Sequence, residues 1–206
     1  MNRFSVLTEV PAFTKGLVRE LRVRWALEEL GLSYEEIRYP HPATKVDPYL
    51  RKQPFGQVPY FTSGDLCMFE SGAILTHLAL KHGRLLPADE AGRAQALTWL
   101  FAALNSVEPF MFHDFMLKDD PDATPAIKAK ARQRARDRVR VLGEALGERE
   151  YFGPSFSIAE IVMTTVLKTA HFLDILGDHP NLFRYVERNE ARPAFRRALS
   201  EHVKLY

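Results

Sequence analysis

Hydrophobic and polar positions follow two different periods along the first eighty residues. The apolar run 4–7 predicts a short strand, and apolar side chains at helical spacing over 16–30 predict the first helix. Gly31 is a typical C-terminal cap for that helix, and the segment 34–39 returns to a strand pattern. These elements make a βαβ unit, in which we expect the two strands to pair in parallel.

Two further strands and a helix complete this half of the chain. Apolar stretches at 58–61 and 66–69 are separated by the polar residues 62–65, which predict a hairpin turn. A helix is predicted from 71 to about 82. The N-terminal domain, residues 1–83, is therefore expected to be an α/β domain of the order βαβ–ββα.

Beyond a polar linker at 87–92 every hydrophobic pattern has a helical period. The apolar positions over 92–117 predict a helix, and we expect Pro109 to kink it because proline removes a backbone hydrogen bond. Further helices are predicted at 126–146, 157–172, 181–189 and 193–202. The sequence thus predicts a second, all-α helical domain over residues 92–206.

Composition and charge narrow the possible partners. The 206 residues carry 28 Lys and Arg against 26 Asp and Glu, and this balance disfavours nucleic acid, which requires a dense basic surface. No signal peptide and no apolar run long enough to span a bilayer is recognised, which predicts a cytoplasmic protein without a membrane partner. The single cysteine, Cys67, excludes a disulfide framework, and the histidine spacing suggests no ligands, so no metal is expected.

The first candidate binding segment surrounds Pro59, at the start of a predicted strand. A strand tolerates proline only at an edge or an end. Val58, the residue before it, therefore has a backbone N–H and C=O to which an extended peptide can add as another strand.

The second candidate segment is the pair Glu70-Ser71. Ser71 begins a predicted helix, whose free N–H groups attract a carboxylate, and Glu70 can pair with an ammonium group. An α-amino acid carries both groups on one carbon and would fit this pair. The alternative is that Ser71 is only an N-cap and Glu70 only a charge in the first turn.

The order and spacing of these segments resemble the glutathione S-transferases. Gln57-Val58-Pro59 matches the family's QVP, Glu70-Ser71 matches its ES, and residues 25–35 resemble the end of its first helix and the following strand. The resemblance implies a thioredoxin-like N-terminal domain with a cis bond before Pro59. It also implies glutathione as cosubstrate, bound by Gln57, Val58, Pro59, Glu70 and Ser71.

A second signature lies in the helical half. Ser157 and Glu160 have the spacing of a capping box, in which the two residues bond reciprocally, and Phe156 with Ile161 forms the matching hydrophobic staple. The motif resembles the family's buried capping box. The resemblance therefore extends over nearly the whole chain.

At the catalytic position the chain departs from the family pattern. The family places Tyr, Ser or Cys near the start of the first helix, and isomerase-like members carry Ser-Ser-Cys ahead of Arg-Val-Arg. Here Arg22-Val23-Arg24 is preceded at those positions by Leu17, Val18 and Arg19, so no hydroxyl or thiol stands there. Arg19 could stabilise a thiolate by its charge, and Thr14 by its hydroxyl. The alternatives are a solvated helix charge for Arg19 and a turn residue for Thr14.

The resemblance implies a homodimeric transferase of alkyl or aryl groups, in which the glutathione thiolate attacks a small electrophile. Phe13, Phe110 and His113 are the candidate walls of an apolar substrate cleft. The alternative is a glutathione-binding or scaffold protein of the same fold without turnover, which the missing hydroxyl favours.

Overall fold

The structure is a computed structural model that describes residues 1–204 and contains two compact units. The first comprises Met1–Leu85 together with the chain from Ala191 onward, and the second comprises Leu86–Glu190. The second unit begins a few residues before the predicted helical domain, 92–206, and ends before its last helix, α9 (Pro193–Lys204), which belongs to the first unit. Within that unit the buried rings of Trp25 and Phe195 meet edge to face, with centroids 4.7 Å apart.

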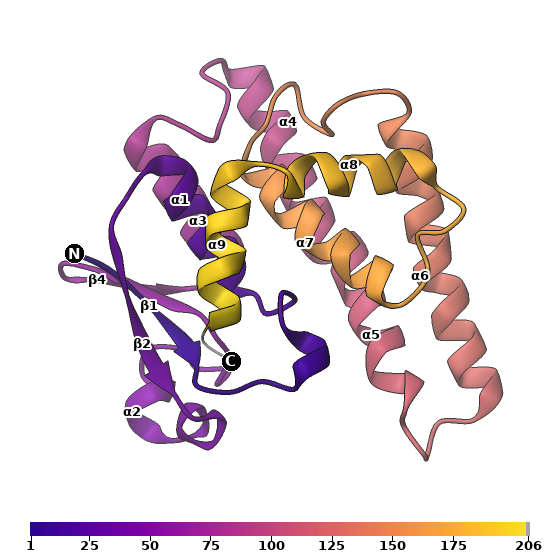
Figure 1. The fold of residues 1–206 in the computed structure, drawn as a ribbon, viewed down its shortest axis with the longest axis horizontal. Coiled ribbons are helices and arrows are strands. Elements are labelled where there is room, and N and C mark those ends of the chain that lie inside the picture. The colour runs from indigo at the N-terminus through magenta and orange to yellow at the C-terminus, as the bar shows by residue number, and fades with distance from the viewer. Residues whose placement is uncertain (205–206) are drawn as a thin grey trace. The chain divides into compact units, whose positions relative to one another are not determined.

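A four-stranded mixed sheet in the order β2-β1-β3-β4 forms the base of the first unit (Figure 1). β1 (Asn2–Leu7) pairs in parallel with β2 (Tyr34–Tyr39) and antiparallel with β3 (Tyr60–Ser63). β3 in turn pairs antiparallel with β4 (Leu66–Phe69). The predicted α/β class, the βαβ–ββα order and the parallel pairing are therefore confirmed.

The helices of this unit are α1 (Glu20–Leu30), α2 (Asp47–Leu50), α3 (Ser71–His82) and α9, with short 3-10 turns η1 (Ala12–Thr14) and η2 (His41–Lys45). α1 packs against both α3 and α9. It ends at Gly31, as predicted, but it begins at Glu20, four residues later than the apolar pattern indicates. Gly16 has a φ of 83°, in the left-handed region, so the chain is not helical there.

The regular structure of the second unit is helical. It contains α4 (Glu90–Phe101), a π-helical segment η3 (Ala102–Val107), α5 (Glu108–Lys118), α6 (Pro125–Leu146), α7 (Ile158–Phe172) and α8 (Pro180–Glu190). Pro109 lacks the N–H that would bond to the carbonyl of Asn105, which lies in η3. The helix predicted over 92–117 is thus divided into α4 and α5 by a π-helical segment that ends just before Pro109, and the kink itself stays a prediction.

Of the predicted capping box at α7, the N-cap role of Ser157 is confirmed and the role of Glu160 is wrong. Ser157 is the N-cap, and its hydroxyl accepts a hydrogen bond from the N–H of Ala159 at 3.2 Å. Glu160 does not complete the predicted reciprocal bond: its carboxylate accepts instead from the N–H of Gly153 at 3.0 Å and from the hydroxyl of Tyr185. Burial raises the pKa of Glu160, and these donors oppose the shift.

Across residues 1–204, none of the helices combines the length and the apolar character needed to cross a membrane.

Candidate functional site

Sheet pairing brings the two predicted binding segments to one end of the sheet. Tyr60, which follows Pro59, is paired with Phe69, which precedes Glu70. β1 runs toward the same end, because its pairing with β3 is antiparallel. The segments that the resemblance assigns to one ligand are therefore neighbours in space, although ten residues lie between Pro59 and Glu70 in the sequence.

The start of α1 also reaches this end of the sheet. Arg22, in the first turn of α1, donates from Nη1 to the hydroxyl oxygen of Ser71, the first residue of α3, at 3.3 Å. Both side chains are buried. Because a guanidinium group only donates, Ser71 accepts here and keeps its own hydrogen for another acceptor. The hydroxyl is thus oriented as a donor beside the N–H groups of a helix N-terminus, which suits a carboxylate.

Glu70 occupies the N-cap position of α3 in an unusual backbone conformation. Its φ is 69° and its ψ is 113°, and its side chain is exposed and makes no capping bond. The interpretation of Ser71 as the N-cap is wrong, since Ser71 is the first helical residue. A positive φ at a residue other than glycine costs about 1–3 kcal/mol, and such strain is concentrated at functional sites.

The peptide bond between Val58 and Pro59 is cis, as the resemblance implies. Hydrogen bonds hold the backbone on both sides of this peptide bond. Tyr49 donates its hydroxyl hydrogen to the carbonyl of Gln57 at 2.6 Å, and Ser5 Oγ accepts from the N–H of Tyr60 at 2.8 Å.

The same two hydroxyls are bonded to each other, with 2.8 Å between Ser5 Oγ and the Tyr49 oxygen. Since Tyr49 has given its one hydrogen to Gln57, Ser5 is the donor in this bond. Ser5 and Tyr49 therefore link β1 to both flanks of the Val58–Pro59 bond. Burial raises the pKa of Tyr49 to about 12, so its hydroxyl stays protonated as a donor.

The candidate catalytic residues lie just ahead of α1. Arg19 is half-buried and occupies the N-cap position rather than the predicted first turn. Thr14 ends η1, and its hydroxyl donates to the carbonyl of Pro11 at 2.8 Å. That bond uses the hydrogen a thiolate would need, which favours the turn-residue interpretation of Thr14. The catalytic roles of both residues stay predictions.

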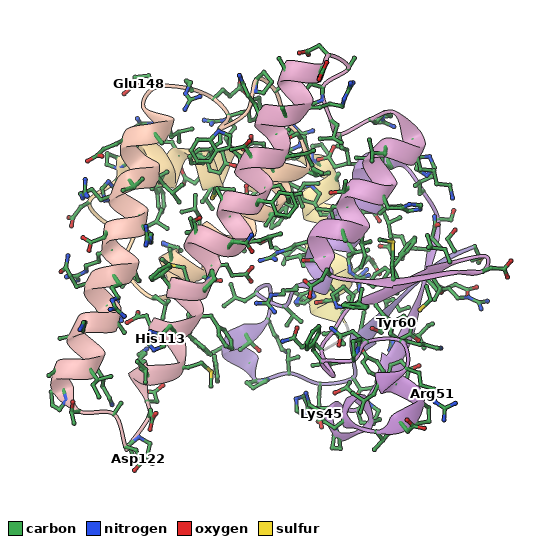
Figure 2. The ribbon with its side chains drawn as sticks, turned by 180° about the vertical axis from the view of Figure 1, so that it is seen from behind. Lys45, Arg51, Tyr60, His113, Asp122 and Glu148 are labelled. Carbon is green, nitrogen blue, oxygen red and sulfur yellow. The ribbon has the colours of Figure 1, made fainter. Side chains whose placement is uncertain are left out.

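Sequence reasoning missed the groups that support this site. Ser5, Tyr49 and Arg22 had no assigned role, and neither had Lys45, whose Nζ donates to the carbonyl of Gly56 at 2.7 Å (Lys45 is labelled in Figure 2). One signal was available for Arg22: it is a charged residue between two apolar ones, Leu21 and Val23, in a helix predicted to pack on the sheet, where burial demands a partner. Ser5 and Tyr49 carry no comparable local signal.

The predicted substrate-cleft residues occur in both units. Phe13 is exposed in η1 of the first unit. In the second unit, Phe110 is half-buried on α5 with the Arg138 guanidinium 4.3 Å from its ring centroid, and His113 is exposed on the same helix (Figure 2). The substrate cleft stays a prediction.

Within residues 1–204 the structure contains no group of three or more His, Cys, Asp or Glu side chains placed to hold a metal ion.

Comparison with known proteins relates these features to one family. Residues 12–80 match the family model described as glutathione S-transferase, N-terminal domain. Glutathione S-transferase P 1 of Xenopus laevis is 27% identical over 213 aligned positions, which cover 97% of this chain and 91% of that protein. A GST-like protein of Streptococcus mutans, itself uncharacterized, is 28% identical over 149 residues, or 66% of this chain. The chain spans 56% of the length of that relative.

The fold is shared as well. A crystal structure of a glutathione transferase family member from Pseudomonas fluorescens, with two glutathione bound, has a TM-score of 0.82 and 26% sequence identity. The match covers 96% of this chain and 92% of that one, so it includes the thioredoxin-like domain and the helical unit alike. The chain therefore has an N-terminal domain of the glutathione S-transferase type and, along almost all of its length, is similar in sequence and fold to proteins of that family.

Proposed function

We propose that this protein binds glutathione in its first unit and transfers the glutathione thiolate to a small, apolar electrophile. The observation that carries the proposal is the meeting of Val58–Pro59 with Glu70–Ser71 at one end of the sheet. These segments offer a strand edge for a peptide, a carboxylate for an ammonium and a donor for a carboxylate. The γ-glutamyl end of glutathione carries that ammonium and carboxylate on one carbon.

In this proposal each group has one task. The N–H and C=O of Val58 bond to the extended backbone of the cysteinyl residue, while Gln57 lies beside it. The carboxylate of Glu70 takes the α-ammonium, and the Ser71 hydroxyl with the helix N-terminus takes the α-carboxylate. Arg19 favours the thiolate over the thiol by its charge. The thiolate sulfur then forms a bond to the electrophilic carbon as the leaving group departs with its electron pair.

A charge-removal pair tests the binding site. Glu70→Gln keeps the side-chain length, and Asp65→Asn makes the same change in the β3–β4 turn, at the other end of the sheet. We expect Glu70→Gln to weaken glutathione binding by about 1.5–3 kcal/mol, the range for a hydrogen bond to a charged group, and Asp65→Asn to leave it unchanged. Isothermal titration calorimetry measures both. Equal affinities in the two variants would remove Glu70 from the site.

A second candidate function is a glutathione-binding or scaffold protein without turnover. It is favoured by the absence of a hydroxyl or thiol at 17–19 and by the engagement of the Thr14 hydroxyl with Pro11. Steady-state conjugation of a chloronitrobenzene, measured beside the calorimetry, separates the two. Binding with turnover supports the transferase, and binding without turnover supports the scaffold.

The remaining parts of the proposal follow from the family. We propose a homodimer in the cytoplasm, where reduced glutathione is available and where the one free cysteine, Cys67, is not oxidised. Size-exclusion chromatography with light scattering would give the molar mass, and a monomer at micromolar concentration would contradict the dimer.

A further inference from the structure

Two buried side chains of the first unit, outside the residues that contact the proposed ligand, form a bonded pair. Glu20 is the first residue of α1, and His202 lies near the end of α9. Both side chains are fully buried. His202 Nδ1 contacts the carboxylate of Glu20, and His202 Nε2 lies 2.8 Å from the backbone nitrogen of Gly16. One imidazole thus bonds α9 to both ends of the segment 16–20.

The bond to Gly16 determines where the imidazole carries its proton. A backbone N–H can only donate, so Nε2 of His202 must accept and therefore has no hydrogen. The single proton of the neutral ring is then on Nδ1, from which it is donated to Glu20. Glu20 in this way stabilises the tautomer that the bond to Gly16 requires.

The segment that His202 holds is the one ahead of α1 where the chain departs from helical geometry. Gly16 has a φ of 83°, and a Cβ added there would meet Leu199 Cδ1 of α9 at 3.4 Å. The neighbouring backbone bond, from Leu17 N–H to the carbonyl of Thr14, is 2.9 Å long. Leu17, Val18 and Arg19 follow directly, at the positions where the family pattern places its thiol-activating side chain.

We propose that His202, oriented by Glu20, is a positioning residue that holds the Gly16–Arg19 segment where the thiol of glutathione is activated. This inference rests on the proposed function, since it assigns the segment a role toward that thiol. The physical reason is geometric. Charge stabilisation of a thiolate falls with distance, and a segment whose backbone is fixed at Gly16 keeps the groups of its next three residues at one distance from the sulfur.

The first experiment measures the tautomer in the wild-type protein without ligand. Nitrogen-15 NMR of protein labelled at histidine distinguishes a protonated from an unprotonated ring nitrogen. We expect His202 to carry its proton on Nδ1 near neutral pH. A proton on Nε2 would overturn the proposal, because that nitrogen could not then accept from Gly16.

Two substitutions of His202 test separately the hydrogen bond that its ring accepts from Gly16 and the one that it donates to Glu20. The terminal amide oxygen of His202→Gln can reach the position of Nε2, so this variant keeps an acceptor for Gly16. The amide nitrogen of His202→Asn corresponds to Nδ1, so this variant keeps the donor to Glu20 and loses the acceptor. We expect the amide of Gly16 to exchange its hydrogen about tenfold faster in His202→Asn and near the wild-type rate in His202→Gln.

The second readout is the apparent pKa of the thiol of bound glutathione, followed as thiolate absorbance against pH. We expect His202→Asn to raise it by about one unit, a tenfold loss in the ratio of thiolate to thiol, and His202→Gln to leave it near the wild-type value. In conjugation assays His202→Asn should lower kcat with little change in the KM for glutathione. A loss of protein stability alone would change neither the thiol pKa nor kcat relative to the KM for glutathione.

The outcomes distinguish this inference from the function on which it rests. Wild-type protein that does not bind glutathione would overturn the proposed function and the positioning role with it. Binding with one thiol pKa in the wild type, His202→Gln and His202→Asn would overturn the positioning role alone. If His202→Asn does not fold, the tautomer in the wild type still decides whether Gly16 is held as proposed.

Discussion

The hydroxyl of Tyr49 offers a direct test of how the loop around Pro59 is held. Tyr49→Phe removes one oxygen and keeps the ring, which is buried with only 1% of its surface exposed. The lost oxygen is the one that donates to the carbonyl of Gln57 and accepts from Ser5. We expect the variant to fold with the ring in place and the loop less restrained.

The structure sets the size of the effect. The bond to Gln57 contributes about 1 kcal/mol, because the exposed Gln57 segment can rebind water. Ser5 is fully buried, so leaving its hydroxyl hydrogen without the Tyr49 oxygen costs a further 1–2 kcal/mol or so. The free energy of unfolding should therefore fall by about 2–3 kcal/mol. Glutathione should bind about 1 kcal/mol more weakly, since the loop must be ordered on binding.

Urea denaturation gives the first quantity and isothermal titration calorimetry the second. Tyr39→Phe is the matched control: its ring packs edge to face on that of Tyr49, and its hydroxyl bonds to the hydroxyl of Tyr60 at 3.0 Å. It should lose about 1 kcal/mol of stability and keep its affinity for glutathione.

Two results would refute the reasoning about Tyr49. If Tyr49→Phe and Tyr39→Phe lose equal stability, the bonds to Gln57 and Ser5 contribute nothing beyond an ordinary hydroxyl. If Tyr49→Phe loses stability but binds glutathione as the wild type does, the hydroxyl supports the fold and not the position of Val58.

Four further predictions follow from strained or buried groups. Glu70→Gly relieves the positive φ and should raise the free energy of unfolding by up to about 1 kcal/mol while weakening glutathione binding; a loss of stability in urea would contradict the strain. Because burial raises the pKa of Glu160, the wild type should lose stability as pH rises from about 4.5 through that pKa, and denaturation against pH should be flatter for Glu160→Gln. Because the pKa of Tyr49 is about 12 when folded and about 10 when unfolded, stability should fall between those pH values, by less in Tyr49→Phe. Glu36→Ala leaves the buried guanidinium of Arg24 without its 2.5 Å partner and should cost about 3 kcal/mol in urea denaturation, whereas a loss below 1 kcal/mol would show that water reaches Arg24.

The sequence by itself determined the elements and their order, because these depend on near neighbours. Alternating and helical periods located the strands and helices of both units, and the βαβ–ββα order made parallel pairing of the first two strands the natural arrangement. Two local signals coincide with features of the structure: Gly31 follows the last residue of α1, and a π-helical segment lies just before Pro109. Order and spacing were likewise enough to indicate the resemblance to the family and the segments proposed to bind glutathione.

Only the tertiary structure decided the partners of the buried polar groups. The apolar pattern continues through 16–19, yet α1 begins at Glu20, and the N–H of Gly16 is bonded to a histidine that lies 186 residues later in the sequence. The carboxylate of Glu160 likewise accepts a hydrogen bond from Tyr185, a residue on another helix, rather than from the backbone of its own N-cap.

The last helix, α9, belongs to the first unit because of contacts with α1 that no local sequence pattern predicts. Arg192, just before its start, pairs with Glu29 of α1, and Arg197 within it pairs with Glu28. Phe195 packs on the indole ring of Trp25. A buried polar or aromatic group takes whichever partner the fold brings within reach, and burial makes a missing partner costly. The hydrophobic period of a segment predicts that one face of its helix or strand is buried. Which element packs on that face depends on residues far along the chain.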